Sequence, residues 1–310
     1  MTVDHDHSSP GGGHGPHLRV PPTRAFALGA GINLTYVLGE VVAGLAAHST
    51  ALLADAGHNL SDVIGLSGGL LAAWLSARRP SAQYTYGMRR ASILSALANA
   101  VILLVVTGAI ALEACLQLAH PEAVNAHLVI AVAAAGIVVN GLTAWLLMDG
   151  RSGDLNLRAG FAHMLADTSI AAGVVVAGGM IALTGWNRVD PAVSLGISVV
   201  IVAGTWGLLR ESVSLSLDAV PAGIDPAAVE EYLRALPGVC EVHDLHVWAL
   251  STTETALTAH LVRRDQHADA DLLCKLPEEV RQRFGIGHAT VQLESPAIAD
   301  ACELRPEHVV

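Results

Sequence analysis

The sequence predicts a membrane protein with two parts: a domain of six transmembrane helices, followed by a small α+β domain whose elements run in the order αββαβ. Three observations support this fold class. Of the 310 residues, 52% are hydrophobic and only 15% are charged, with a mean hydropathy of +0.49, whereas soluble chains carry about 25% charged residues. Six long apolar segments occupy the first part of the chain. Charges become frequent only after them.

The composition also excludes some classes of protein. The formal net charge is −11, which excludes a generally basic nucleic-acid binder. The cysteines Cys115, Cys240, Cys274 and Cys302 are far apart in the sequence. They do not indicate a disulfide framework, and they fit a soluble part that faces a reducing cytosol.

Residues 1–23 predict a disordered tail rather than a signal peptide, because no apolar segment follows the start. The tail is rich in His, Gly and Pro and too polar to form a core. Two interpretations stay open. One is a flexible arm that collects metal ions through His5, His7, His14 and His17. The other is a solvated tail without a binding role, derived in part from cloning.

The transmembrane domain is assigned to residues 24–210. Its apolar segments lie at residues 24–47, 51–77, 91–119, 126–148, 155–184 and 191–209. Each reaches or approaches the roughly 20 residues that a spanning helix needs. The turns between them are short, so consecutive helices should be antiparallel neighbours. In the second segment, Gly65 and Gly69 have the G-x-x-x-G spacing that permits close helix approach, but the general glycine enrichment of membrane helices is the favoured explanation.

Arginine residues are distributed unevenly around these segments. One side holds Arg19, Arg24, Arg78, Arg79, Arg89, Arg90, Arg151, Arg158 and Arg210, and the connections on the other side hold only Arg188. By the positive-inside rule, both termini are expected in the cytoplasm. The high Ala and Gly content favours a bacterial origin and therefore the cell (inner) membrane.

Residues 211–296 predict a cytoplasmic α+β domain, and residues 297–310 a C-terminal tail. A helix is expected to begin at Asp225-Pro226, residues typical of the N-cap and the first helical position. The remaining elements are expected as strands at 239–250 and 254–262, a helix at 269–284 and a last strand at 288–294. Helices covering one face of this sheet would make a two-layer domain.

Two His-x-x-x-Asp pairs lie within the apolar segments: His58 with Asp62, and His163 with Asp167. Residues four apart share one face of a helix. Two such helices packed together would offer two imidazoles and two carboxylates to one ion, a set suited to tetrahedral zinc. Ionisable groups at membrane depth cost a few kcal/mol each and usually face a pathway. We therefore hypothesise a metal-ion transporter.

The depth of the two pairs supports this hypothesis. At 1.5 Å per residue, each pair lies roughly 10–18 Å from a membrane surface, near the middle of a hydrocarbon core about 30 Å thick. The pattern alone is loose, because a third copy, His267 and Asp271, falls in an expected soluble helix. The membrane setting of the first two pairs argues against two unrelated buried polar pairs.

The C-terminal domain is rich in residue types that bind metal ions: His243, His246, His260, His267, His288, Glu294, Cys302 and His308. His243 and His246 lie three apart on a strand, so they are expected on opposite faces and not in one site. His260, His288 and Glu294 lie on strands or strand ends and are expected to converge with one of them. Solvated surface histidines are the alternative.

Several motifs in combination resemble the cation diffusion facilitator family, in its zinc-type bacterial branch. They are GEVVAGLAAHSTALLADAGHNLSD (39–62), YTYG (84–87), the second His-x-x-x-Asp pair, HDLHVW (243–248) and HATVQLE (288–294). The resemblance covers nearly everything after Arg19.

The resemblance implies a homodimer in the lipid bilayer, in which each subunit joins a six-helix domain to a ferredoxin-like cytoplasmic domain. It implies export of Zn²⁺ from the cytoplasm in exchange for protons, with Co²⁺ and Cd²⁺ as further candidate substrates. The transport site would be His58, Asp62, His163 and Asp167. A regulatory zinc site would comprise His243, His260, His288 and Glu294, with Cys302 as an addition.

The same resemblance makes two further statements. The loop at residues 78–90 has no His, Asp, Glu or Cys, so the metal site that some members carry there is expected to be absent. Branches with Asp at the position of His58 accept Cd²⁺ more readily, so His58 indicates a preference for zinc.

Three other functions compete with transport. An intramembrane zinc protease would show H-E-x-x-H, and the sequence has no such string, so no enzyme is predicted. A channel is disfavoured, because a tight four-ligand site would hold its ion too long for fast conduction. A membrane-anchored metal sensor that binds without transport stays open, and flux across a sealed bilayer would distinguish it.

Overall fold

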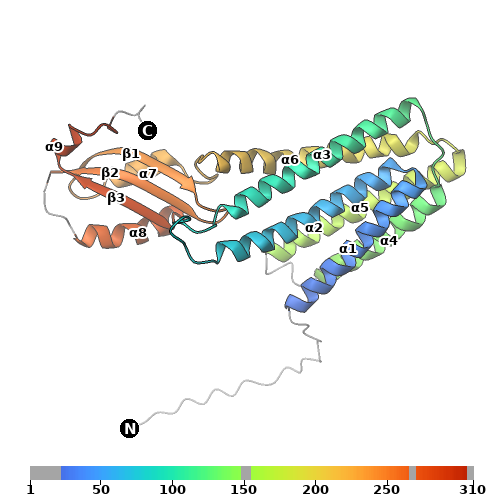
Figure 1. Ribbon diagram of the computed structural model, residues 1–310, viewed down its shortest axis with the longest axis horizontal. Coiled ribbons are helices and arrows are strands. Elements are labelled where there is room, and N and C mark those ends of the chain that lie inside the picture. Colours follow the sequence, from blue (N-terminus) through green and yellow to red (C-terminus); the bar gives the residue numbers. More distant parts are fainter. Residues whose placement is uncertain (1–21, 148–154, 265–269, 306–310) are drawn as a thin grey trace, which may run out of the picture.

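The structure is a computed structural model that describes residues 22–147, 155–264 and 270–305. Figure 1 shows an elongated molecule with a helical bundle at one end and a small sheet domain at the other. The predicted His-rich tail lies outside the described residues, except for its last two positions, and so do His267 and His308.

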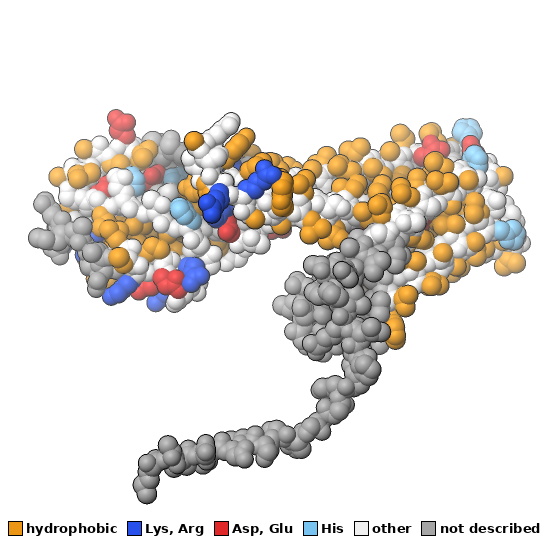
Figure 2. All heavy atoms as spheres, turned by 60° about the horizontal axis from the view of Figure 1, so that its bottom comes forward, with side chains coloured by type: hydrophobic (Ala, Val, Ile, Leu, Met, Phe, Trp, Pro, Cys, Tyr) orange, Lys and Arg blue, Asp and Glu red, His pale blue; other side chains and the backbone are white. Residues whose placement is uncertain are grey.

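Six helices form the bundle, as the sequence predicts. They are α1 (Pro22–Ala47), α2 (Thr50–Ser76), α3 (Ala91–Ala119), α4 (Ala126–Leu147), α5 (Leu155–Thr184) and α6 (Val189–Ser216). Among the described residues, four stretches are long and apolar enough to cross a membrane: Ala91–Ala119, Ala126–Trp145, Phe161–Thr184 and Val189–Ser216. The outer surface of the bundle is covered by apolar side chains (Figure 2), such as Leu38, Val42, Leu70 and Val105. This surface fits contact with lipid.

Small residues line the inside of the bundle. Ala47, Ala51 and Ala54 from α1 and α2 pack with Val129 of α4 and Val174 of α5 in one buried cluster. Short side chains allow the helix backbones to approach closely, which is how transmembrane helices gain packing energy.

The packing of α2 on α3 involves two glycines, but not the pair with the G-x-x-x-G spacing. A Cβ atom at Gly65 would lie 2.9 Å from Asn99 Nδ2, and one at Gly68 would collide with Ser95. A Cβ atom at Gly69 would meet nothing within 4 Å. The face of α2 that packs on α3 therefore contains Gly65 and Gly68, which are spaced i, i+3. Gly69, spaced i, i+4 from Gly65, lies outside this contact.

The sixth helix is longer than its apolar segment. The sequence predicts an end at Leu209, where the charged residues begin, but α6 continues to Ser216. Arg210 and Glu211 are good helix formers, so the helix leaves the apolar layer without breaking. Figure 1 shows its last turns entering the neck between the two domains.

The C-terminal domain has the predicted order αββαβ and is a small α+β, ferredoxin-like unit. Its elements are α7 (Pro226–Arg234), β1 (Val239–Ala249), β2 (Thr255–Arg263), α8 (Ala270–Phe284) and β3 (His288–Glu294), followed by the short α9 (Pro296–Ala299). The strand β2 lies in the centre, antiparallel to β1 and parallel to β3.

The two faces of this sheet differ in chemistry. Leu257 and Leu261 of β2 face the helices and pack with Leu233 of α7 and Val280 of α8. Because side chains alternate along a strand, His260 of β2 points to the opposite face. His243 of β1 is its register partner on that face, so the sheet places these two imidazoles together.

The two domains meet at a packed joint. Ile93 of α3, Leu215 of α6 and Ala249 of β1 form one buried cluster. The turn between β1 and β2 rests on the start of α3, where the Thr252 N–H donates to Ser92 Oγ at 3.1 Å. A cavity of about 540 Å³ lies beside this turn, between α2 and α3.

Ion pairs also cross the joint. Arg89 pairs with Glu254 of the turn, and Arg90 pairs with Asp218 just after α6. Two of the arginines that set the predicted orientation therefore also hold the domains together.

Candidate metal centres

The first candidate centre lies inside the bundle, where α2 and α5 bring the two His-x-x-x-Asp pairs together. Each ring nitrogen approaches the carboxylate of the other helix: His163 Nε2 lies 3.1 Å from Asp62 Oδ2, and His58 Nε2 lies 3.3 Å from Asp167 Oδ1. The two intrahelical His–Asp distances are 3.9 Å and 3.6 Å. All four donor atoms lie within 4.8 Å of one another.

These distances can be compared with those of a zinc site. Bonds of 2.0–2.3 Å in tetrahedral geometry separate the ligand atoms by about 3.3–3.8 Å. The His–Asp distances lie close to that range, so an ion would need only small movements of the side chains. The sequence predicted these four residues as one group, and the structure brings all four together.

Burial distinguishes the members of this group. Asp167 is only 1% exposed, and neither of its carboxylate oxygens has a hydrogen-bond partner. His58 Nδ1 is also buried without a partner. Buried polar atoms without partners are costly. A cation held by this group would remove that cost.

A polar network in the apolar interior supports α2 beside the centre. The Tyr36 hydroxyl donates to Glu40 Oε1 at 2.9 Å, and Asn59 Nδ2 donates to Glu40 Oε2 at 3.2 Å. Asn59 is the neighbour of His58 in the chain, so α1 fixes the rotation of α2 at the metal centre. Glu40 lies within the motif at residues 39–62, but no local pattern predicts this contact.

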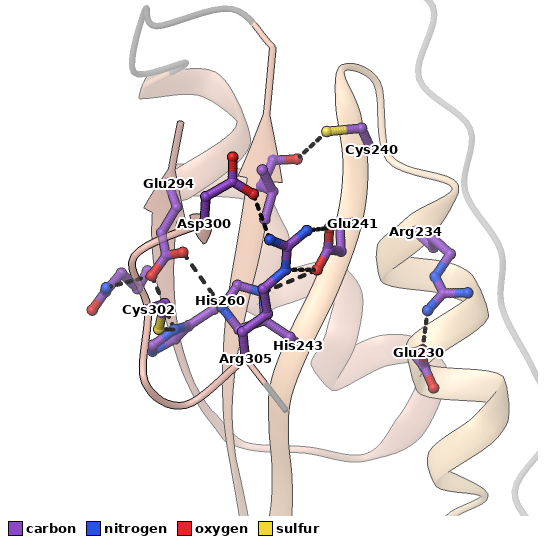
Figure 3. A network of polar contacts seen from close by, with 12 residues as sticks. Glu230, Arg234, Cys240, Glu241, His243, His260, Glu294, Asp300, Cys302 and Arg305 are labelled. Carbon is purple, nitrogen blue, oxygen red and sulfur yellow. Dashed lines mark hydrogen bonds and ion pairs between the residues drawn. The ribbon is translucent and has the colours of Figure 1, made fainter. Parts of the chain in front are cut away.

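The second candidate centre lies on the open face of the C-terminal sheet and involves His243, His260, Glu294 and Cys302, whose donor atoms also lie within 4.8 Å of one another. His260 Nδ1 lies 3.0 Å from Glu294 Oε1 and 3.8 Å from Cys302 Sγ. His243 Nε2 lies 3.4 Å from Glu294 Oε2. Figure 3 shows the four side chains converging from β1, β2, β3 and the C-terminal segment.

The donor set and its burial both fit a zinc ion. Two imidazoles, a carboxylate and a thiol are ligands that zinc accepts. Both ring nitrogens of His243 and Glu294 Oε2 are buried without a hydrogen-bond partner. Such atoms in a mostly buried cluster are expected where a cation completes the site.

The segment that carries Cys302 is fastened by an arginine. Arg305 Nε and Nη2 each donate to Glu241 at 2.8 Å, and Nη1 donates to Asp300 at 2.5 Å (Figure 3). The guanidinium of Arg305 lowers the pKa of Glu241 and Glu241 raises the pKa of Arg305, because each charge stabilises the other. This clamp fixes the segment on both sides of Cys302.

The structure corrects the predicted position of His288. This residue was expected to join the cytoplasmic cluster, but it pairs with Ala256 at the other end of β2. It lies six residues before Glu294 on β3, which is roughly 20 Å along a strand. Its ring instead contacts Tyr86 of the α2–α3 loop edge to face, at 5.5 Å between centroids. It therefore belongs to the joint between the domains.

The expectation that His243 and His246 lie on opposite faces is wrong, for a physical reason, although the two residues do not join one cluster. The β1–β2 register shifts between these residues, so that His243 pairs with His260 and His246 pairs with Thr258. Asp244 and Leu245 of β1 thus oppose Ala259 of β2 alone. A bulge of this kind reverses the alternation, and both histidines reach the same face. His246 Nε2 lies 2.8 Å from Asp244 Oδ1, outside the four-residue cluster.

Sequence reasoning missed the residues around the ligands. Asp244 was quoted within HDLHVW without a role, although its place directly after a candidate ligand was a usable signal. Arg305 and Glu241 gave no such signal, because their contact spans 64 positions of the chain.

Comparisons with known proteins agree with this architecture. Residues 27–215 match the family model described as the cation efflux transmembrane domain, and residues 221–296 match the cation efflux protein, cytoplasmic domain, a model named ZT_dimer. The zinc transporter ZitB of Escherichia coli is 34% identical, over 98% of this chain and 96% of its own.

Other relatives are transporters of similar cations. The metal cation efflux system protein CzcD of Cupriavidus metallidurans is 32% identical, over 95% of this chain and 90% of its own. A cadmium, cobalt and zinc/H(+)-K(+) antiporter of Bacillus velezensis is 30% identical, over 95% and 93%. A solved structure of the metal-bound C-terminal domain of CzcD is 38% identical, over 23% of this chain and 99% of its own, with a TM-score of 0.21.

Two family models thus match the two domains in order, and relatives at 30% identity or more align with almost the whole chain. The chain is an integral membrane protein and a metal cation transporter rather than an enzyme, and it belongs to the cation efflux, or cation diffusion facilitator, family.

Proposed function

We propose that the chain exports Zn²⁺ from the cytoplasm in exchange for protons, with His58, Asp62, His163 and Asp167 as the transport site. The observation that carries this proposal is the arrangement of four donor atoms from two helices within 4.8 Å, inside an apolar bundle. Relatives of this chain are named as zinc, cadmium and cobalt transporters.

The geometry supplies a reason for proton coupling. His163 Nε2 and Asp62 Oδ2 are hydrogen-bonded at 3.1 Å and can share a proton, and His58 Nε2 faces Asp167 Oδ1 of the other helix across 3.3 Å. The same nitrogen and oxygen atoms are the zinc ligands. Zinc and protons therefore compete for one set of atoms. Imidazole titrates near neutral pH, so a change of access from cytoplasm to exterior exchanges one cation for the other.

The orientation follows from the charged residues. Two arginines, Arg78 and Arg79, follow α2, and two more, Arg89 and Arg90, precede α3. All four lie at the end of the bundle where the C-terminal domain is attached. This concentration of positive charge supports a cytoplasmic location for that end and for both termini. The name of the model that matches residues 221–296 supports a homodimer.

The centre formed by His243, His260, Glu294 and Cys302 would bind Zn²⁺ as a regulatory ligand. When bound, the ion supplies a cross-link between the three strands and the C-terminal segment. The joint to α2 and α3 lies at the other end of the same strands. A sheet ordered by the ion would therefore also fix the position of the β1–β2 turn against these helices.

The proposed function can be tested by measuring Zn²⁺ flux. The purified chain is reconstituted in sealed vesicles with a zinc-sensitive dye inside and an imposed pH gradient. We expect flux that depends on the gradient and is abolished by Asp62→Ala and by His163→Ala. His127→Ala, which removes an exposed histidine of α4, is the matched control and should transport normally.

The remaining alternative gives a different result. A membrane-anchored sensor would bind zinc but leave the vesicle interior free of it. Zinc binding without flux in the wild-type chain would therefore refute transport. Flux that ignores the pH gradient would refute proton coupling alone.

A further inference from the structure

We propose that Asp244 is a positioning residue of the cytoplasmic metal centre, which holds the His260 imidazole with its proton on Nε2 and its Nδ1 lone pair directed at the ion. This inference rests on the proposed function of that centre. It concerns the contact between Asp244, which is not one of the four candidate ligands, and His260, which is one of them.

The two nitrogens of His260 face different groups. Nδ1 lies 3.0 Å from Glu294 Oε1 and 3.8 Å from Cys302 Sγ, inside the candidate centre. Nε2 lies 3.5 Å from Asp244 Oδ2 on the other side of the ring. A neutral imidazole carries one proton and one lone pair. Without an ion, the carboxylates of Glu294 and Asp244 compete for this proton from opposite sides of the ring. When a cation occupies the Nδ1 side and is bound by Glu294, the carboxylate of Asp244 holds the proton on Nε2 and Nδ1 binds the ion.

The backbone is shaped to make this contact. On a regular strand, Asp244 would point away from the face that holds His243. Asp244 instead adopts φ +50° at the register shift between His243 and His246. Positive φ is uncommon for residues other than glycine and is found in places with a functional constraint. Here it turns a carboxylate that is only 12% exposed toward His260.

His246 completes the arrangement from the solvent side. Its Nε2 lies 2.8 Å from Asp244 Oδ1, and its side chain is 40% exposed. The carboxylate is therefore held between two imidazoles, with one oxygen for each. A carboxylate fixed at both oxygens has little freedom to rotate. This fixes the side of the His260 ring on which the proton lies.

A second metal ion between His246, Asp244 and His260 is the competing explanation. It would require His260 to bind one ion through each nitrogen and hence to lose both ring protons. A neutral imidazole has a single lone pair for a metal. The positioning role requires His260 to keep one ring proton, as a neutral imidazole does. The geometry therefore favours the positioning role over a second ion.

The test uses the full-length chain in detergent, with the transport site disabled by Asp62→Asn and Asp167→Asn. Zinc affinity and stoichiometry are measured by titration, and the protonated nitrogen of His260 is identified by ¹⁵N NMR with zinc bound. Asp244→Asn keeps a side chain that tolerates positive φ and removes the charge. Asp244→Gly keeps the backbone conformation and removes the side chain.

We expect one ion at this centre in the wild type and a loss of affinity of about 10–100-fold in Asp244→Gly, as for other residues that orient metal-binding histidines. Asp244→Asn should retain part of the affinity and show His260 with a mixture of protonated nitrogens. Glu231→Gln, at an exposed carboxylate of α7, is the matched control and should change neither measurement.

Three results would overturn the inference. Unchanged affinity and an unchanged His260 proton in both Asp244 variants would refute the role of Asp244 while leaving the centre in place. Loss of one bound ion on His246→Ala would establish the second-ion site instead. A wild-type chain that binds no ion at this centre would refute the regulatory centre itself, and the inference with it.

Discussion

Asp190, in the first turn of α6, accepts a hydrogen bond from the main-chain N–H of Ala51 in the first turn of α2, at 3.1 Å. The same carboxylate accepts from the hydroxyls of Ser49 at 2.5 Å and Thr50 at 3.0 Å. The first N–H groups of a helix have no partner within it. Asp190 of α6 supplies an acceptor for such an N–H group of α2, and its negative charge is favourable near the N-terminus of that helix. His58 follows two turns later on α2.

Replacing Asp190 should therefore destabilise the bundle. We expect Asp190→Ala to lower the free energy of unfolding by about 1–3 kcal/mol, because it leaves buried donors without an acceptor. Asp190→Asn should lose less, since an amide oxygen can still accept. Thermal unfolding of the detergent-solubilised protein measures this. Thr50→Val, which removes one of the three donors and keeps the shape of the side chain, is the control with a smaller effect. An unchanged unfolding temperature in Asp190→Ala would contradict the capping role.

Two neighbouring glycines of α2 should respond differently to the same substitution. Gly68→Ala places a Cβ atom against Ser95 of α3, and overpacking of this kind costs about 1–3 kcal/mol. Gly69→Ala meets nothing within 4 Å and should be neutral or slightly stabilising, because alanine favours the helix. The measurement is the unfolding temperature of both variants. Equal effects would show that α2 does not pack on α3 through Gly68.

The clamp between Arg305 and Glu241 predicts a pH dependence. Arg305 lowers the pKa of Glu241 below its ordinary value of 4.5. The contribution of the Arg305–Glu241 pair to stability is therefore complete at pH values above the ordinary pKa of a glutamate. It is lost as the pH falls through the lowered pKa of Glu241. Carboxyl ¹³C NMR should show Glu241 titrating below 4.5, and Arg305→Gln should return it toward the ordinary value. Titration of Glu241 at the same pH in both proteins would exclude the pairing in solution.

The thiol of Cys302 should bind the ion of the cytoplasmic centre directly. Co²⁺ bound in place of zinc should show a thiolate-to-metal charge-transfer absorption that disappears in Cys302→Ser. Cys240→Ser and Cys274→Ser remove exposed cysteines outside the cluster, so their spectra should match the wild type. Zinc affinity should fall in Cys302→Ser alone. An absorption band that survives this substitution would remove Cys302 from the ligand set.

The sequence predicted those features that depend on local pattern. The helices α3 and α5 begin and end at the predicted residues, because long apolar segments have clear limits. The four residues of the proposed transport site were grouped because spacing on a helix fixes a shared face and the length of the apolar segments fixes depth. Both properties can be read without knowledge of the tertiary structure.

The sequence did not predict features that depend on register or on distant contacts. His288 was placed in the wrong cluster because strand pairing decides which end of β2 it reaches. His246 was placed on the wrong face because one bulge reverses the alternation along β1. The contact between Asp190 and Ala51 joins residues 139 positions apart, and no pattern along the chain indicates it.

The bulge in β1 and the turn at its end together form a lever. From His246 to Ala249 the strand spans roughly 10 Å at 3.3 Å per residue, and the turn follows it. A change of about 10° in strand direction at the bulge would therefore move the base of the turn, and its tip with it, by about 2 Å. That tip lies against Ser92 and beside the cavity between α2 and α3. A small angular adjustment near the metal centre would thus displace the turn where the two domains touch.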